Sequence, residues 1–322
     1  MLNFNYQIKL FLYFLGIIYF LLLNKFCSNN HQIKLDNTFG DNQGLHPKVI
    51  AFKDLWNGYK YWMVYTPYLY GDETKENPVI NVSNDLKTWI SPKGVNNPLD
   101  IPLVCDANNY NSDTHLLFND KNNQLELFWR YVNNNENKVT IYKIHSKNGI
   151  NWNKSEIFLE SDNRKILDFV SPVIMFNDNV YRIWYVNHKK IYYIEKKGQN
   201  ITIPRIININ YKNDYLTWHF DLIYNEDKKL YELIACAYKK KITKMPLFYI
   251  SSKDNENWTI PIKIMEPSHN AFKFDSESLY RSSLIYENKR YFLLYSAYDK
   301  NRKVGMSIKY GENITNLKPY IK

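Results

Sequence analysis

Polar side chains recur at one place in a repeated pattern of strands, and their types suit acid–base chemistry on a polar substrate. In each copy of the repeat, this position lies five residues before the aromatic residue that ends a short apolar strand. The five copies have Pro47, Asp113, Ser171, His219 and Arg281 at this position. His46 stands beside the first place. Since side chains alternate along a strand, we expect His115 and Asp221 to face the same way as the residues two positions before them. Carboxylates and imidazoles gathered in this way could move protons at one site.

The strands that carry these residues belong to an internal repeat. Each copy has an apolar strand, a polar turn and a second strand heavy in aromatics, and the aromatics that close the first strands are Phe52, Phe118, Phe176, Tyr224 and Tyr286. Strand repeats of this length indicate a β-propeller, and an aromatic content of 16% suits half-buried, pleated surfaces. We predict an all-β domain over residues 40–318, a five-bladed β-propeller of four-stranded antiparallel blades.

A second repeat, S-x-[DN]-x-x-x-W, occurs at residues 83–89, 146–152 and 252–258. Asp and Asn side chains close tight turns onto their own backbone, and Trp supplies a large buried area. The pattern resembles the Asp-box turn of β-propeller glycosidases and sialidases, and here it would join the third and fourth strands of a blade. The loops that enter first strands, and those that join second and third strands, then share the opposite face. Glu76 and Glu277 are expected to join the polar residues there.

The chain as a whole resembles the five-bladed β-propeller glycosidases of the arabinanase, β-xylosidase and β-fructosidase type, which are glycoside hydrolase family 43-like. The resemblance rests on residues 46–47, 56–63, 66–68 and 76–78. It implies a pocket in which inward carboxylates serve as base, proton donor and sugar-orienting group. Asp113 occupies the place of the orienting carboxylate. His46 and Pro47 stand where the family has its catalytic base. Ser171 stands where the family has its catalytic acid.

We therefore expect the catalytic carboxylates to be Asp113, Asp221, Glu76 and Glu277. The expected substrate-binding residues are His46, His115, Ser171, His219, Arg281, Tyr68 and Asn77. Structural roles stay open for several of them, such as strand capping by Asp113, an internal hydrogen bond of His219 with Asp221, or a buried ion pair of Arg281. The predicted function is that of an exported glycosidase acting on a glycan or oligosaccharide. Two alternatives stay open, a non-catalytic glycan-binding propeller and a structural or adhesive surface protein.

The N-terminus differs from the rest of the chain. Residues 10–23 are an unbroken apolar run of 14 residues. That is shorter than the roughly 20 residues of a membrane-spanning helix, and it suits the apolar part of a secretory signal. We assign residues 1–28 to a signal peptide or an N-terminal signal-anchor. The protein is then expected to be secreted, periplasmic or on the cell surface, with membrane contact only through this segment.

The chain carries 42 basic and 32 acidic residues, a formal net charge of +10. Its lysines are spread over turns, so we interpret the charge mostly as solvated surface and expect a carbohydrate partner rather than nucleic acid. Attraction to anionic polysaccharide or to a membrane surface is a secondary alternative. No Cys or His spacing predicts a metal site. No cofactor is expected, apart from a structural Ca²⁺ that an oxygen-lined central channel could hold. Cys105 and Cys236 could pair, although Cys236 also fits a small core residue.

Overall fold

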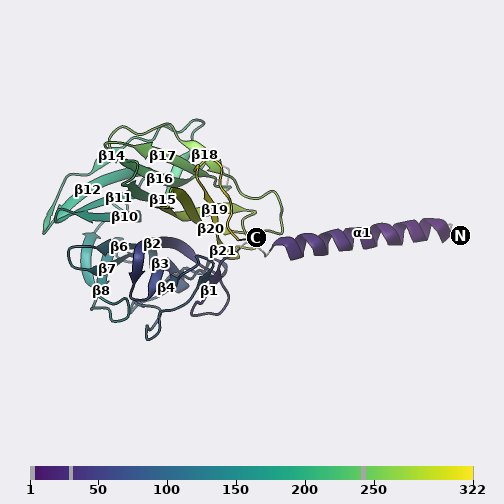
Figure 1. The fold of residues 1–322 in the computed structure, drawn as a ribbon, viewed down its shortest axis with the longest axis horizontal. Coiled ribbons are helices and arrows are strands. Elements are labelled where there is room, and N and C mark those ends of the chain that lie inside the picture. The colour runs from purple at the N-terminus through teal and green to yellow at the C-terminus, as the bar shows by residue number, and fades with distance from the viewer. Residues whose placement is uncertain (1–3, 29–31, 241–243, 322) are drawn as a thin grey trace.

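The computed structural model describes residues 4–28, 32–240 and 244–321, and within them five blades surround one axis (Figure 1). The innermost strands contact one another in ring order, and the last contacts the first. They are β2 (Leu45–Trp56), β6 (Asn109–Asn119), β10 (Val170–Asn177), β15 (Leu216–Asn225) and β19 (Ser278–Glu287). The prediction of a five-bladed propeller is confirmed.

Each blade grows outward from its innermost strand through antiparallel neighbours. The first blade continues with β3 (Tyr59–Thr66) and β4 (Val79–Ser83), and an isolated bridge between Val82 and Ile90 attaches β5 (Thr88–Trp89) at its outer edge. The second blade continues with β7 (Gln124–Asn133), β8 (Lys138–Ser146) and β9 (Glu156–Ser161). The third has β11 (Val180–Asn187) and β12 (Lys190–Lys197), and β12 pairs with both β13 (Asn200–Ile201) and β14 (Arg205–Ile207). The fourth has β16 (Leu230–Tyr238), β17 (Leu247–Ser252) and β18 (Ile262–Met265), and the fifth has β20 (Arg290–Tyr298), β21 (Val304–Gly311) and β22 (Lys318–Pro319). Two short 3-10 turns, η1 (Leu69–Gly71) and η2 (Glu73–Lys75), lie between β3 and β4.

Apolar side chains pack between the blades rather than around one centre. In the described residues, each pair of neighbouring blades shares a buried cluster. The second strands contribute the completely buried side chains of Trp62, Trp129 and Trp184. Large aromatic side chains remove much apolar area from water. The aromatic second strands seen in the sequence therefore hold neighbouring blades together.

The three S-x-[DN]-x-x-x-W turns join third and fourth strands and are closed alike. Asp85 Oδ1 accepts hydrogen bonds from the backbone N–H groups of Lys87 and Thr88, at 2.8 and 2.9 Å. Asn148 and Asp254 close their turns in the same way. The Trp that ends each turn packs against a cluster between blades, and Trp89 is fully buried, whereas Trp152 and Trp258 are half-buried.

A short N-terminal segment closes the ring. Strand β1 (Lys34–Leu35) pairs in parallel with β5 of the first blade. Just ahead of it, Gln32 forms a bridge with Ser307 of the fifth blade, and the Ile33 N–H donates to Met306 O at 3.1 Å. The Ile33 side chain is completely buried. Within the described residues, Gln32, Ile33, Lys34 and Leu35 therefore contact the propeller.

β-Bulges interrupt all five innermost strands close to where each begins. In the first three blades a residue of the bulge has left-handed backbone: His46 (φ 54°), Asp113 (φ 47°) and Ser171 (φ 53°). An extra residue changes which face the following side chains take. The alternation expected from Asp113 to His115 is therefore broken. His115 Nε2 instead lies 2.8 and 3.1 Å from the backbone O and N of Ile174 in the next blade.

A helix, α1 (Phe4–Ser28), precedes the propeller and extends away from it in Figure 1. Its residues 6–22 are exposed. Among the described helices, none combines the length and the apolar character needed to cross a membrane. The helix coincides with the segment 1–28 picked out by the sequence, apart from residues 1–3, which lie outside the described residues.

Cys105 and Cys236 are both free thiols, so the disulfide that they could have formed is not made. Cys236 is buried in the cluster between the fourth and fifth blades. Cys105 lies in a loop, and its Sγ is 3.3 Å from Thr74 O. The interpretation of Cys236 as a small core residue is the one that holds.

Candidate active site

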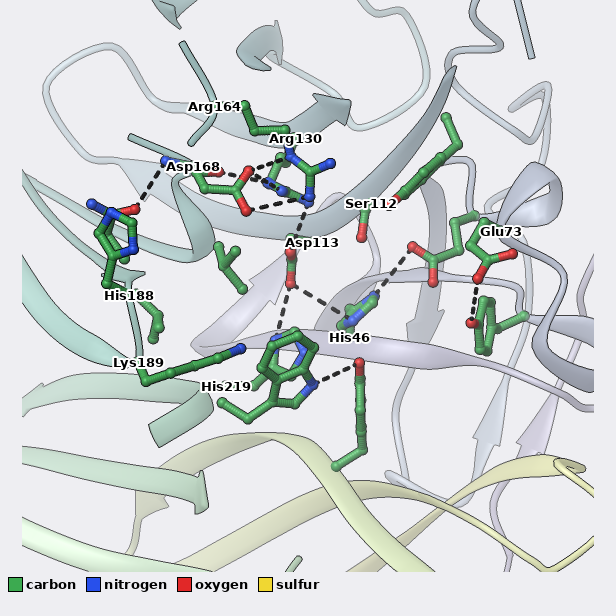
Figure 2. A pocket seen from close by; sticks show the side chains of 18 of the residues that line it. His46, Glu73, Ser112, Asp113, Arg130, Arg164, Asp168, His188, Lys189 and His219 are labelled. Carbon is green, nitrogen blue, oxygen red and sulfur yellow. Dashed lines mark hydrogen bonds and ion pairs between the residues drawn. The ribbon is translucent and has the colours of Figure 1, made fainter. Parts of the chain in front are cut away.

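A cavity of about 610 Å³ opens on the face where the innermost strands begin (Figure 2). Its lining comes from strand entries, such as Asp113 and His219, and from loops between second and third strands, such as Tyr68 and Glu76. The sequence analysis assigned these two kinds of segment to one face. The structure confirms that placement.

Asp113 lies at the centre of a polar cluster, which we call the hub. Its Oδ1 lies 3.7 Å from His46 Nε2, 3.2 Å from His219 Nδ1 and 3.7 Å from Arg281 Nη1. Its Oδ2 lies 3.8 Å from Arg130 Nη1. All five side chains are buried, and they come from four different blades. Figure 2 shows His46 and His219 converging on Asp113 from separate strands.

Burial decides the protonation of the hub histidines. It lowers the pKa of His46 to about 3, against the opposing effect of Asp113, and it lowers the pKa of His219 in the same way. Burial alone would raise the pKa of Asp113, but the surrounding His and Arg side chains outweigh it and hold that pKa well below its usual range. The hub therefore contains neutral imidazoles and an ionised carboxylate.

Three atoms of the hub face one another without partners. His46 Nε2, Asp113 Oδ1 and His219 Nδ1 lie within 4.8 Å of one another. Although His219 Nδ1 is 3.2 Å from Asp113 Oδ1, none of the three atoms has a partner in hydrogen-bonding geometry among the described residues. Buried polar atoms are normally hydrogen-bonded, and neighbouring lone pairs repel. A cation among them would satisfy all three atoms. Neutral imidazoles with a carboxylate suit Zn²⁺ and similar divalent metals. No sequence spacing could reveal this set, because its members lie on strands of three blades.

Glu76 is the second carboxylate close to the hub. It comes from the loop between β3 and β4, is 5% exposed, and places Oε2 4.0 Å from His46 Nδ1. That oxygen has no hydrogen-bond partner in the described part of the chain. Burial, reinforced by the negative charge of Asp113, raises the pKa of Glu76 well above its usual value. A carboxyl with a raised pKa can both accept and return a proton near neutral pH.

Several lining residues were not anticipated from the sequence. Arg130 lies on β7 and donates through Nε to the backbone O of Asp168 at 2.8 Å, and its Nη2 pairs with the Asp168 carboxylate. Trp218 and Tyr280 form an aromatic wall, in which Trp218 Nε1 donates to Tyr280 OH at 3.0 Å. Trp218 directly precedes His219, and Tyr280 directly precedes Arg281, two residues identified in the sequence analysis. The bulges bring these neighbours into the cavity.

Two of the expected residues lie in the axial channel, outside the cavity lining. Lys48 Nζ of the first blade lies 2.6 Å from Asp221 Oδ1 of the fourth, and both are buried. Arg281 of the fifth blade donates through Nη2 to Pro172 O of the third at 2.9 Å. Asp221, expected to be catalytic, is therefore bound to an ammonium group. The cationic side chains of Lys48 and Arg281 thus lie where the sequence analysis allowed for a structural Ca²⁺.

Other expected residues make structural contacts instead. The Ser171 hydroxyl lies 3.0 Å from the backbone O of Phe220 and 3.1 Å from its N, which links the third and fourth blades. Asn77 accepts a hydrogen bond from Asn111 Nδ2 at 3.1 Å. Glu277 is half-buried just before β19. None of these residues is part of the cavity lining.

No protein-family model matches the chain. A curated relative, the A type blood N-acetyl-α-D-galactosamine deacetylase of Flavonifractor plautii, is 25% identical over 303 residues. The match takes in 78% of this chain and 39% of the relative. The chain thus spans about two fifths of the length of the curated relative that it matches.

Solved structures show the same architecture. An N-acetylgalactosamine deacetylase from F. plautii, in complex with blood group B trisaccharide, has a TM-score of 0.77 at 20% identity, over 88% of this chain and 94% of that one. An exo-β-1,3-galactanase from Phanerochaete chrysosporium has a TM-score of 0.61 at 11% identity, over 87% and 63%. An exo-1,5-α-L-arabinanase from a bovine ruminal metagenomic library has 0.59 at 14%, over 83% and 92%. The fold is that of the propeller glycosidases. The resemblance drawn from the sequence is confirmed at this level.

The hub does not present the pair of free carboxylates that glycosidic hydrolysis uses, although Glu73 also lines the cavity and accepts a hydrogen bond from Tyr68 OH at 3.4 Å. Asp113 is surrounded by imidazoles and guanidiniums, Asp221 is bound to Lys48, and only Glu76 is both near the hub and free of cationic partners at hydrogen-bond distance among the described residues. One proton-transferring carboxyl beside a His–Asp–His cluster suits metal-assisted hydrolysis.

Proposed function

We propose that this protein hydrolyses the N-acetyl group of an acetylated amino sugar in a glycan, with a divalent metal held by His46, Asp113 and His219. The observation that carries the proposal is the set of three buried ligand atoms that face one another without partners. Action on a glycan is supported by the carbohydrate-active enzymes among the relatives, and the bond class by the F. plautii deacetylase.

A divalent metal bound at the hub would polarise the acetyl carbonyl and lower the pKa of a water molecule. The protein supplies the proton transfers. Glu76 is placed beside His46, and it can take a proton from the attacking water and give it to the amide nitrogen as the C–N bond breaks. His219, His46 and Arg130 favour the ionised form of Asp113, the form that can act as a ligand. The products are acetate and a glycan that carries a free amine.

The test is to measure both possible bond cleavages in one reaction. The purified protein is incubated with oligosaccharides that end in N-acetylgalactosamine or N-acetylglucosamine, and mass spectrometry follows acetate release and chain length. We expect acetate release with intact glycosidic bonds, inhibition by a chelator, and recovery when Zn²⁺ is added. Shortened chains without acetate would identify a glycosidase. Binding without either cleavage would identify a glycan-binding propeller.

Export remains part of the proposal. It is supported by the apolar run at residues 10–23 and by the exposed helix that contains it. Fractionation of cells that express the full chain tests it. A protein found entirely in the cytoplasmic fraction, at full length, would contradict it.

A further inference from the structure

One wall of the cavity is rich in basic side chains. The loops and strands around the third blade contribute Arg130, Arg164, Lys165 and Lys189, against the single carboxylate of Asp168. That carboxylate is shared, because both Arg130 and Arg164 pair with its Oδ1. The carboxylates Glu73 and Glu76 belong to the first blade instead. This basic wall therefore carries more positive charge than its own acidic residue can balance.

Lys189 and the exposed Lys165 have no acidic partner among the described residues, and of the two Lys189 is the partly buried one. No carboxylate oxygen of the described residues lies within ion-pair distance of its Nζ, which sits 3.7 Å from the ring centroid of Trp218 and 5.6 Å from that of Tyr238. Figure 2 shows its side chain extended toward His219, with the ammonium group directed into the cavity. Ring faces offset only part of the cost of removing a cation from water. A bound anion would offset more of it.

The turn that carries Lys189 has an unusual composition. His188 (φ 47°) and Lys189 (φ 65°) both have left-handed backbone in the two-residue turn between β11 and β12. Asn, Asp and Gly are the usual residues there, and the turn at the other end of β11 has Asp178 and Asn179. Lysine also occurs in a second two-residue turn, as Lys289. The turn at the cavity differs from it in having His188 before a lysine that points inward. Strained residues that persist in this way often serve a site.

We propose that the cavity binds glycans in which the sugar next to the acetylated residue carries an anionic substituent, a carboxylate or a sulfate ester, and that Lys189 recognises this group. The inference rests on the proposed function in that it assigns the substrate class of the same cavity. Arg164 and the exposed Lys165 would attract the anion to the rim. Lys189 would bind it beside Trp218, whose face can stack on the sugar ring.

The experiment compares binding of three matched oligosaccharides to the full chain by calorimetry. All contain the same N-acetylhexosamine, and the neighbouring sugar is neutral, sulfated or a uronic acid. We expect the better of the two charged ligands to bind at least about 10-fold more tightly than the neutral one, with the preference falling as ionic strength rises. Lys189→Gln should remove about 10-fold of that preference. Lys190→Gln, which removes the same charge from the adjacent exposed residue outside the cavity lining, should leave it unchanged.

The outcomes separate this inference from the proposed function. Equal affinity for neutral and charged ligands, or equal effects of Lys189→Gln and Lys190→Gln, would overturn the inference, while acetate release could still establish the deacetylase. A preference for charged ligands that depends on Lys189, without acetate release, would support the inference and overturn the deacetylase. The sulfated and uronic acid ligands identify which anion is recognised.

Discussion

His115 and His219 are equally buried on innermost strands, but they differ in bonding. His115 Nε2 lies within hydrogen-bond distance of the Ile174 backbone, whereas neither nitrogen of His219 has a hydrogen-bond partner in the described residues. A buried side chain that bonds the neighbouring blade contributes to stability. One whose ring nitrogens are left open contributes little to stability through hydrogen bonding and is available to a ligand.

This contrast predicts that substitution by Gln mainly lowers stability at His115 and mainly lowers metal affinity at His219. His115→Gln should lower the free energy of unfolding by about 1–3 kcal/mol, because the Ile174 backbone loses its partner. His219→Gln should change it by less than about 1 kcal/mol when measured in chelator, yet lower metal affinity and acetate release at least about 100-fold. Thermal melts in chelator and metal titrations check both. Equal metal affinity in the two variants would remove His219 from the proposed metal site.

Glu76 gives a second prediction for a single residue. Glu76→Gln keeps the size of the side chain but cannot move a proton, so kcat for acetate release should fall about 100-fold or more. Metal content should stay at the wild-type level, since Glu76 is not among the three proposed ligands. Metal analysis and steady-state kinetics on the same preparation decide the matter. Unchanged kcat would mean that another group transfers the proton.

The innermost strands show what could be predicted from sequence and what could not. The repeat of strands and turns was enough to predict five blades, the face that bears the cavity, and the presence there of Asp113, His46, His219, Glu76 and Tyr68. A bulge is invisible to the period-2 pattern, so His115 was assigned the wrong face and Tyr280 was overlooked. Partners across the axis, such as Lys48 for Asp221, join residues far apart in the chain. No local pattern encodes them.

The turn at Gly149 provides a prediction for an element. Gly149 has φ +70°, and an added Cβ would lie 2.1 Å from the Trp62 ring of the neighbouring blade. Gly58 has a similar left-handed backbone, φ +85°, but open space around it. Gly149→Ala should therefore lower the free energy of unfolding by about 2–3 kcal/mol more than Gly58→Ala, because only Gly149→Ala adds a clash to the backbone strain. Urea denaturation of both variants measures the difference, and similar values would argue against the tight contact with Trp62.

The Trp residues of the repeated turns give another comparison between elements. Trp89 is fully buried between the first and fifth blades, so Trp89→Ala should cost roughly 3–5 kcal/mol. Trp152 is only half-buried, and Trp152→Ala should cost less. Melting temperatures of the two variants rank them. A larger loss for Trp152→Ala would contradict this ranking.

At the scale of the whole molecule, residues 32–35 join the first blade to the fifth. They are the part of the described chain that contacts β5 and β21 together, through Lys34, Leu35, Gln32 and Ile33. Loss of this segment removes these contacts at the place where the two ends of the ring meet, although β2 also contacts β19 directly. The loss also exposes the buried apolar surface on both sides of that interface.

Two truncations test the closure. A chain that starts at Gln32 should melt close to the full-length protein, since residues 6–22 of α1 are exposed. A chain that starts at Asp36 loses Ile33 and Leu35, and it should be less stable by at least about 2–5 kcal/mol, the usual effect of truncating one buried Ile. Calorimetry would show whether the melt also broadens. Equal melting temperatures would show that the ring does not need the segment.

The pairing of Lys48 with Asp221, together with Arg281, has a consequence for how polymers are handled. Among the described residues, these buried side chains join innermost strands across the axis below the cavity. For the proposed deacetylase we therefore expect substrate to enter and product to leave through the same cavity mouth, which favours action on chain ends or short branches and a new encounter for every turnover.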